Sequence, residues 1–416
     1  MKTKPLKALF GIFLAGMLLL HGVMAWQARG LVRRGYPDFT IFYAAGKIID
    51  QGLGRSLYDE STEARVEQQF APTVDIRHGA LPYMHPPFEA LLFLPLTKFS
   101  YPAAFLLWDG LNLLILLALP FIVRPYVPGL AEIPLALCLL AALAMFPVFL
   151  ALLQGQDTFA LLLLLTLAWR ELRRDAAVAA GCWLGLGLFR FHLVLPILLV
   201  LLCRGGRRAA LGFSSTALGL AAISVWLVGW HEAVAYPVYL WRLESNLGNG
   251  AIVPRVMPNL RGLMASLVPA ADGRIGQLMV VVVSLAVLAF ACWKWQSGGS
   301  GSRLDLGFSL LIVSSVVVSY HGFAHDLGLL FLPLLLVWGR WQERPDWHLS
   351  TQWALVLPPL VLWFSPLLML LLFRYGRLNV LAPVLLLWMW GIGREISREQ
   401  AREPRLAEVR PASESG

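Results

Sequence analysis

The stretch Leu6–Trp26, LKALFGIFLAGMLLLHGVMAW, decides the class of this protein, because it is apolar over the length that a membrane helix requires. About 20 predominantly apolar residues suffice for an α-helix to cross the hydrocarbon core of a bilayer. The stretch is similar to a secretory signal peptide, but no small-residue cleavage site follows it, and Trp26 closes it as an interface anchor. We therefore expect a retained first transmembrane helix.

The composition of the whole chain extends this expectation to many helices. Of the 416 residues, 58% are hydrophobic and only 14% are charged, and the mean hydropathy is +0.67. A soluble core of this length would not need so much apolar surface, so we expect an all-α polytopic membrane protein. The net charge of +9 is spread over short basic clusters between apolar runs, so it indicates topology and no nucleic-acid partner.

The apolar runs predict about 12 transmembrane helices with both termini in the cytoplasm. The basic clusters support this topology, because they all fall on the side of the amino terminus, as expected for cytoplasmic loops. After the first span, the candidates lie near 101–123, 132–152, 158–169, 176–188, 193–203, 209–229, 275–296, 306–320, 327–338, 351–372 and 378–392. The basic clusters are Arg170/Arg173/Arg174, Arg204/Arg207/Arg208, Lys294/Arg303, Arg340/Arg344 and the tail from Arg394.

The weak point of this topology is His85–Phe99, because HPPFEALLFLPLTKF is apolar but too short to cross a membrane comfortably. We expect a half-span or re-entrant helix that enters from outside. A full span here would invert every later loop and place the arginine clusters on the wrong face.

Two long segments, 27–84 and 230–274, are extracytoplasmic in this topology. In the first, apolar residues recur at helical spacing from Phe39 to Leu53, and a second helical run covers Leu57–Phe70. We expect these short helices to lie on the membrane surface. The second segment is typical of an ordered surface loop.

A Gly/Ser-rich stretch divides the rest of the chain. It predicts a flexible cytoplasmic linker over 297–304, between a catalytic transmembrane module, 1–296, and a C-terminal transmembrane module, 305–393. The charged tail 394–416 is expected to be disordered.

Polar residues that interrupt the apolar runs fall mostly on the outer face. Several flanking spans are shorter than the usual ~20 residues, which places these polar groups below the membrane surface in a cavity. Ionisable groups at such depth are candidates for function. The clusters are Asp38, His85, Gln154-Gly155-Gln156-Asp157, Arg190-Phe191-His192, Asn259/Arg261, and His321 with His325-Asp326.

Arg190 is the strongest candidate for an anion ligand, because it lies between Leu-rich helices and its planar guanidinium suits phosphate. His192 could add a neutral donor or a positive charge to the same anion. Two structural interpretations stay open: the long side chain of Arg190 reaches the membrane interface, or it pairs with Asp157.

Two other clusters have structural alternatives as well. Asp157 before Thr158 is a helix start signal, but capping does not explain Gln154 and Gln156 beside a glycine, a neutral array that suits sugar hydroxyls. His321 and His325 share a helix face, as metal ligands would. The sequence lacks the glutamate of a metallohydrolase motif there, so ligand hydrogen bonding or a structural role is favoured over a divalent metal.

Asp38, in Tyr36-Pro37-Asp38-Phe39-Thr40, stands shortly after the first span at the head of the first external segment. Its structural alternative is to N-cap a helix that begins at Phe39. A capping aspartate need not stand so close to the membrane, however, and Pro37 fixes the approach of the chain. We therefore favour a positioned carboxylate.

A series of short motifs lies between Asp38 and Arg190: Tyr43-Ala44-Ala45-Gly46, Leu57-Tyr58-Asp59, Tyr83-Met84-His85-Pro86-Pro87-Phe88, Gln154-Gly155-Gln156-Asp157 and Gly187-Leu188-Phe189-Arg190. In order and spacing, over roughly residues 36–210, the series resembles glycosyltransferase family 87 of the GT-C superfamily. This sequence departs from the family in having Met84-His85 where Tyr is common, Asp157 where Asn is common, and Arg190-Phe191-His192 in place of Lys-Pro.

The resemblance implies a GT-C-like membrane enzyme that takes a hexose, often mannose, from a polyprenyl phosphate and inverts the anomeric centre. It implies an active site on the outer face of a bacterial-type cytoplasmic membrane, a lipid or glycan acceptor, contact with membrane lipids, and no cofactor. Asp38 matches the general base of such enzymes, and we expect Arg190, His192 and His325 to hold the donor phosphate. The residues expected to bind sugar or acceptor are Tyr43, His85, Gln154, Gln156, Asp157, Asn259, Arg261, His321 and Asp326; no metal ligands are expected.

Other classes of function stay open. A flippase or transporter of a lipid-linked sugar also needs many spans, but it more often shows internal repeats, and the sequence has none that we find. A lipid-linked glycan ligase or polymerase would shift catalysis to the later external segment with Arg242, Arg255 and Arg261. A scaffold protein would keep the fold without catalysis.

Overall fold

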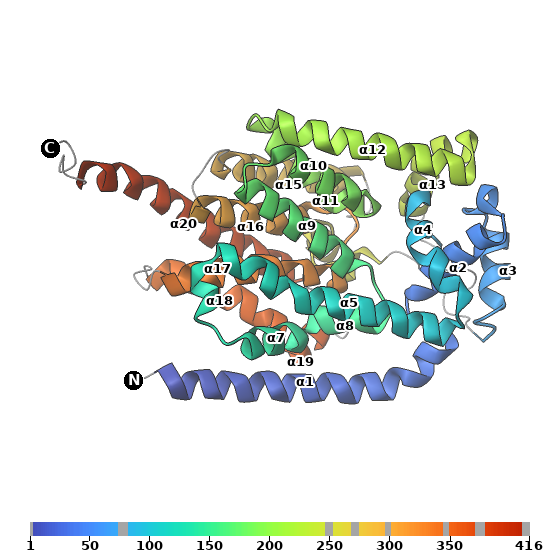
Figure 1. Cartoon of the computed structure of the whole chain (residues 1–416), viewed down its shortest axis with the longest axis horizontal. Helices are drawn as coiled ribbons and strands as arrows, with labels where there is room; N and C mark the ends of the chain where they lie inside the picture. The colour runs from blue at the N-terminus through green and yellow to red at the C-terminus, as the bar shows by residue number, and fades with distance from the viewer. Residues whose placement is uncertain are drawn as a thin grey trace.

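The apolar runs form helices that lie side by side and give the molecule two ends (Figure 1). The computed structural model describes residues 3–73, 82–245, 253–267, 274–295, 301–343, 349–370 and 379–409. Among these residues, every regular element is an α-helix or a short 3₁₀-helix. Helices satisfy their own backbone hydrogen bonds, which is what a chain in lipid requires, and the all-α expectation is confirmed.

The longer helices carry most of the apolar sequence. The start of α1 and the end of α20 lie at the same end of the molecule (Figure 1). The helices are α1 (Thr3–Arg34), α5 (Tyr101–Val123), α7 (Leu135–Ala144), α8 (Phe146–Gln154), α9 (Thr158–Arg173), α10 (Ala177–Leu186), α11 (Phe191–Cys203), α12 (Arg207–Val228), α15 (Arg274–Lys294), α16 (Gly301–Val318), α17 (Phe331–Glu343), α18 (Leu349–Trp363) and α20 (Leu381–Val409).

By length and apolar composition, six helical stretches of the described residues are able to cross a membrane. The pair α7–α8, bent by 65°, makes seven if it forms one span. The chain is thus a polytopic membrane protein, whereas the expected count of about 12 spans is not confirmed, because several expected spans are shorter helices. The six stretches are Ala8–Asp50, Tyr101–Tyr126, Ala177–Cys203, Arg207–Val228, Ile275–Lys294 and Gly301–Val318.

The stretch Ala177–Cys203 contains a reversal of the chain. α10 packs on α12 so closely that a Cβ atom on Gly181 would lie 1.9 Å from the carbonyl oxygen of Ala209. One straight helix from Gly181 to Cys203 would be about 33 Å long, yet the chain from Cys203 to Ala209 reaches at most about 20 Å. The chain therefore turns back at η5 (Gly187–Arg190), which places Arg190 at the tip of the α10–α11 hairpin.

The end opposite the start of α1 is built from shorter helices (Figure 1). Within the first external segment, the two predicted helices are present as α2 and α3. The segment His85–Phe99 forms only short helical turns that pack on α2, and the rings of Phe42 and Phe93 stack at 4.7 Å. The elements are α2 (Phe39–Asp50), η1 (Gly54–Ser56), α3 (Glu60–Gln68), η2 (Pro87–Glu89), α4 (Ala90–Phe93), η3 (Leu94–Lys98), α13 (Trp230–Ser245), η7 (Pro254–Val256) and α14 (Leu260–Leu267).

Several expected boundaries differ from the structure. α1 continues to Arg34 rather than ending at Trp26, and α13 and α14 occupy much of the expected surface loop. Residues 301–304 of the expected linker are the first turn of α16, and 297–300 lie outside the described residues.

The tail from Arg394 is helical up to Val409, not disordered, while 410–416 lie outside the described residues. Its charges make contacts within α20 and with α16. Arg398 pairs with Glu395 at 2.6 Å, and Ser302 on α16 donates to Glu399 at 2.9 Å. Such pairs stabilise the helical form of a sequence that is charged enough to remain unfolded alone.

The two expected transmembrane modules share one hydrophobic core. A single cluster of buried side chains runs from Leu14 on α1 to Ile396 on α20. Buried Asp305 on α16 joins both sides of the expected boundary, because it accepts from Trp169 on α9 at 2.9 Å and from Arg340 on α17 at 3.0 Å. The region after the linker is therefore part of the same packed unit.

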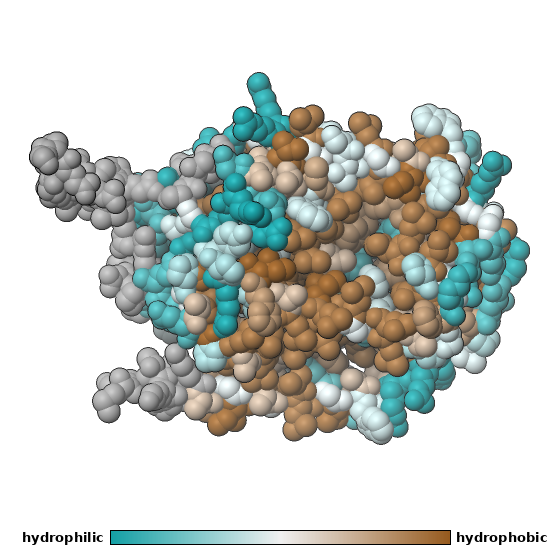
Figure 2. Space-filling model, in the orientation of Figure 1, coloured by the Kyte–Doolittle hydropathy of each residue, from teal (hydrophilic) through white to brown (hydrophobic). Residues whose placement is uncertain are grey.

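Figure 2 shows hydrophobic residues over the middle of the visible face and hydrophilic residues toward its two ends. Large apolar side chains are exposed on the outer helices, including Leu106 on α5, Leu218 on α12 and Leu285 on α15. Exposed apolar surface of this extent is unusual for a soluble protein and suits contact with lipid.

Gly212→Ala is expected to destabilise the α10–α12 contact, which fixes the hairpin that carries Arg190. The added Cβ atom would lie 2.0 Å from the carbonyl oxygen of Val178, so the two helices must separate. We expect a loss of about 1–3 kcal/mol, read as a lower Tm of the purified protein in detergent. Gly219→Ala on the same helix is the matched control, because nothing lies within 4 Å of its added Cβ. Equal Tm values for the two variants would contradict this packing.

Candidate active site

A cavity of about 310 Å³ opens where the short helices meet the bundle. Asp38 and Arg190 both line it, so the expected base and the expected phosphate ligand lie on one cavity. Its size is at the lower end of the range for small-molecule sites. The lining residues are Asp38, Ile41, Pro82, Met84, His85, Leu150, Gln154, Gln156, Arg190, Val253, Val256, His321, Phe323, Ala324 and His325.

Asp38 is placed by the turn between α8 and α9. Its side chain makes no capping hydrogen bond to α2, so the capping alternative does not describe this structure. Its backbone N–H donates to Gln154 Oε1 at 3.1 Å, and Gln156 Nε2 donates to its carboxylate Oδ2 at 2.7 Å. The carboxylate is therefore held by the neighbouring turn, whose Gln154 and Gln156 also line the cavity.

Arg190 is buried and its guanidinium makes contacts in three directions. Nε donates to Asp157 at 2.8 and 3.1 Å, and Nη2 donates to both Asp157 and Gln156. Nη1 lies 3.4 Å from Asp326 Oδ1 and makes no hydrogen bond to the described residues. The predicted pairing with Asp157 is present, and it coexists with a position on the cavity wall.

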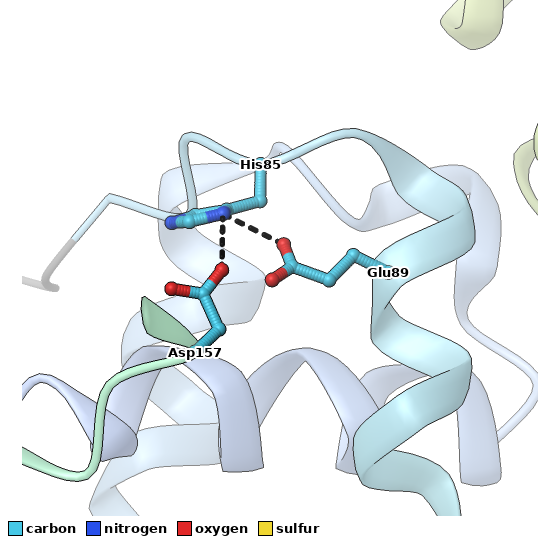
Figure 3. A group of neighbouring side chains, drawn as sticks. All are labelled: His85, Glu89 and Asp157. Atoms are coloured by element: carbon cyan, nitrogen blue, oxygen red, sulfur yellow. Dashed lines mark ion pairs between the residues drawn. The ribbon is translucent and has the colours of Figure 1, made fainter. Parts of the chain in front are cut away.

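At the cavity wall, His85 meets Glu89 and Asp157, which do not line the cavity themselves (Figure 3). One donor atom from each lies within 4.8 Å of the others, and His85 Nδ1 is 2.7 Å from Glu89 Oε2 and 3.9 Å from Asp157 Oδ2. These nitrogen and oxygen donors could hold a cation. Glu89 was not foreseen as a site residue, and the sequence had pointed to no metal here.

The electrostatics of this cluster also allow a proton in place of a cation. Burial and the negative charge of Asp157 raise the pKa of Glu89 well above its usual value. Burial alone would raise the pKa of Asp157, but the charge and hydrogen bonds of Arg190 outweigh it and lower that pKa. A neutral Glu89 beside an ionised Asp157 can share its proton with that carboxylate.

Glu89→Gln is therefore expected to fold, because glutamine resembles a protonated glutamic acid. Since the pKa of Glu89 is raised on folding, its contribution to stability is full below the unfolded pKa of about 4.3 and is lost as pH rises through the folded pKa. The wild type should therefore lose stability as pH is raised, whereas Glu89→Gln should not. The difference between the Tm of the variant and the Tm of the wild type should accordingly increase with pH.

Exposed Glu60→Gln is the control for this measurement and should show no such pH-dependent difference. If Glu89→Gln is less stable at every pH, and divalent cations raise the Tm of the wild type alone, the cluster binds metal instead of sharing a proton.

A second buried glutamate contacts His321, which lines the cavity. Glu244 on α13 accepts from Arg261 Nη1 at 2.5 Å and bonds to His321 Nδ1 at 2.6 Å. Burial would raise the pKa of Glu244, but His321 and Arg261 outweigh it and lower that pKa. The pair orients His321 on the cavity wall, whereas Arg261 is used in this contact and does not line the cavity.

The cavity brings together seven of the residues that the sequence singled out: Asp38, His85, Gln154, Gln156, Arg190, His321 and His325. The other six lie behind the wall or elsewhere. Tyr43 donates to the carbonyl of Phe99, His192 Nδ1 is bonded to Ser319, and Asn259 binds the backbone of Gly262 and Ser319. Asp326 accepts from the backbone N–H of Phe323 and faces Arg190, while Asp157 and Arg261 form the ion pairs described above.

Four supporting residues were missed by sequence reasoning: Glu89, Trp108, Asn112 and Glu244. Glu89 follows His85 by four residues in an apolar segment. An ionisable residue in such a segment is a candidate for function, so the sequence did contain a signal for Glu89. Trp108 and Asn112 share one face of α5 and donate to the backbone carbonyl of Gln156, at 3.3 and 2.9 Å. Nothing in the local sequence marks Glu244, because its partners are far away in the chain.

Fold and site together define a class: a helical membrane protein with a polar, partly ionised cavity next to a group of short helices. The family model of glycosyltransferase family 87 matches residues 83–319, more than half of the chain. The chain therefore belongs to glycosyltransferase family 87 and is a glycosyltransferase. The match begins after Asp38 and extends beyond residue 210, where the series of short motifs ends. Neither the curated proteins nor the solved structures contain a significant match.

Proposed function

We propose that this glycosyltransferase transfers a hexose, mannose or a similar sugar, from a polyprenyl-phosphate donor to a lipid or glycan acceptor, with inversion. The observation that carries the proposal is the position of Asp38 and Arg190 on one cavity. A carboxylate and a guanidinium on one cavity suit a reaction in which a hydroxyl loses a proton while a phosphate departs with negative charge.

In the proposed reaction, the acceptor hydroxyl attacks the anomeric carbon from the face opposite the phosphate. Its proton passes to Asp38 as the new C–O bond forms. The bond between the anomeric carbon and the phosphate oxygen breaks, and its electron pair leaves with the polyprenyl phosphate. Arg190, through Nη1, and His325 stabilise that charge, and His192 acts from behind the wall through its neighbours.

The remaining polar wall is proposed to bind the sugar and the acceptor. His85, Gln154 and His321 line the cavity and carry donors and acceptors suited to hydroxyl groups. Tyr43, Asn259 and the ionised pairs around Asp157, Arg261 and Asp326 would act as supports for this wall. The reaction as proposed needs no metal cofactor.

The proposed topology places this cavity on the extracytoplasmic face, within a GT-C-like fold of about 12 spans. The support is the distribution of positive charge. α9 begins beside the cavity residue Gln156 and ends with Arg170 and Arg173, and α11 begins beside Arg190 and is followed by Arg204. Arg173 and Arg340 meet at Asp305, so these basic residues gather at the helix ends away from the cavity. Positive residues favour the cytoplasmic side, which would make both termini cytoplasmic in a bacterial-type inner membrane.

The direct test uses purified protein in vesicles with polyprenyl-phosphate sugars and a candidate lipid acceptor. Release of free polyprenyl phosphate that depends on both substrates is the expected result. A flippase would move the donor across the bilayer without releasing polyprenyl phosphate, so sugar movement without release would reject the proposal.

A further inference from the structure

We propose that Gln156 is a positioning residue, whose amide links the general base Asp38 to Arg190 and holds the Asp38 carboxylate in its reactive orientation. This inference rests on the proposed function of Asp38 and Arg190. It assigns to Gln156 a role other than contact with the sugar, which is what the sequence had suggested.

The link consists of two hydrogen bonds on one buried side chain. Gln156 Nε2 donates to Asp38 Oδ2 at 2.7 Å, and Gln156 Oε1 accepts from Arg190 Nη2 at 2.5 Å. Gln156 is only 3% exposed, so water does not compete effectively for either bond.

The orientation of the amide follows from chemistry. Arginine has donors and no acceptor, so the amide atom that faces Arg190 must be the oxygen. The amide nitrogen then faces Asp38, and because it can only donate, Asp38 Oδ2 must accept. The link therefore requires Asp38 Oδ2 to carry no proton, which is the state of a general base before it acts.

The turn that carries Gln156 is itself fixed from two other elements. Its backbone carbonyl accepts from Trp108 and Asn112 on α5, and Gly155 has the left-handed φ of 61°. A Cβ atom on Gly155 would lie 2.8 Å from the Cβ atom of Phe39, the residue after Asp38. The turn and the start of α2 are thus in contact, which sets the distance between amide and carboxylate.

Only an amide satisfies both neighbours. A carboxylate at this position would still accept from Arg190 but would offer an oxygen to Asp38, with a second negative charge. A shorter amide could not reach both residues at once. A glutamate at position 156 therefore tests the effect of the added charge, and an asparagine tests the effect of the shorter side chain.

The test is the pH profile of kcat/KM for Gln156→Glu in purified, folded protein. We expect kcat to fall on the order of a hundredfold, as for loss of one oriented donor. The acid limb should move to higher pH by about one unit or more, because two carboxylates that share a site resist ionising together. Gln51→Glu, at the exposed residue that follows α2 and does not line the cavity, is the charge control and should match the wild type.

Gln156→Asn adds no charge and covers the case in which Gln156→Glu does not fold. It should lose kcat while KM and the acid limb stay close to those of the wild type. Wild-type kcat and an unshifted acid limb in a folded Gln156 variant would overturn the link. Failure of the proposed function would look different, because the wild type itself would then release no polyprenyl phosphate.

Discussion

Asp38→Asn is expected to reduce sugar transfer by a hundredfold or more, with the fold intact. Asparagine keeps the shape of the side chain but cannot accept the proton of the acceptor hydroxyl, and a positioned base contributes about 10²–10⁴-fold to such a step. The measurement is turnover of purified protein with a polyprenyl-phosphate sugar, together with Tm to confirm folding.

Asp59→Asn is the matched control for this substitution. Asp59 lies in the same external segment and is a true N-cap, since its side chain accepts from Thr62 N at 2.9 Å. Its loss should cost a few tenths to about 1 kcal/mol of stability and little turnover. Near-normal transfer by Asp38→Asn would remove Asp38 from the reaction and leave it a structural role.

Arg190→Met is expected to cause the largest loss of stability among these variants. It leaves the buried carboxylate of Asp157 without the cation that lowers its pKa. Breaking one side of a buried pair typically costs about 3–5 kcal/mol, whereas neutralising both sides is often tolerated. The measurements are yield of monodisperse protein and Tm in detergent.

The double variant Arg190→Met with Asp157→Asn separates the structural role of Arg190 from its proposed role at phosphate. Stability should recover in large part, because no buried charge is left unpaired in this pair. Transfer should stay at background, because the departing phosphate has lost its cation. If the double variant recovers both stability and transfer, Arg190 is a structural residue only.

Part of the site was within reach of sequence reasoning. Asp38, His85 and Arg190 are polar residues at the ends of apolar runs, and the cost of burying charge in a membrane marks such positions locally. His192 carries the same mark and Tyr43 belongs to a family motif, yet neither lines the cavity, because their side chains bond to Ser319 and Phe99. Local sequence shows that a polar group is buried, but it does not show in which direction its side chain is turned.

The sequence by itself determined that this protein is helical, lies in a membrane and follows its first long apolar helix with short helices. Each of these properties follows from apolar length and helical spacing, which act over neighbouring residues. The described part of the tail, up to Val409, is helical where disorder was expected, and its Glu399 finds a partner on α16 that no local pattern marks.

Only the tertiary structure decided how the site is connected. Gln156 meets Asp38 across 118 positions of the chain, and Glu244 meets His321 across 77. Hydrogen bonds of a side chain depend on distance and direction in space, and no spacing in the sequence encodes them. The sequence marked Asp38 and Arg190 as separate candidates, whereas the amide that joins them depends on how the helices pack.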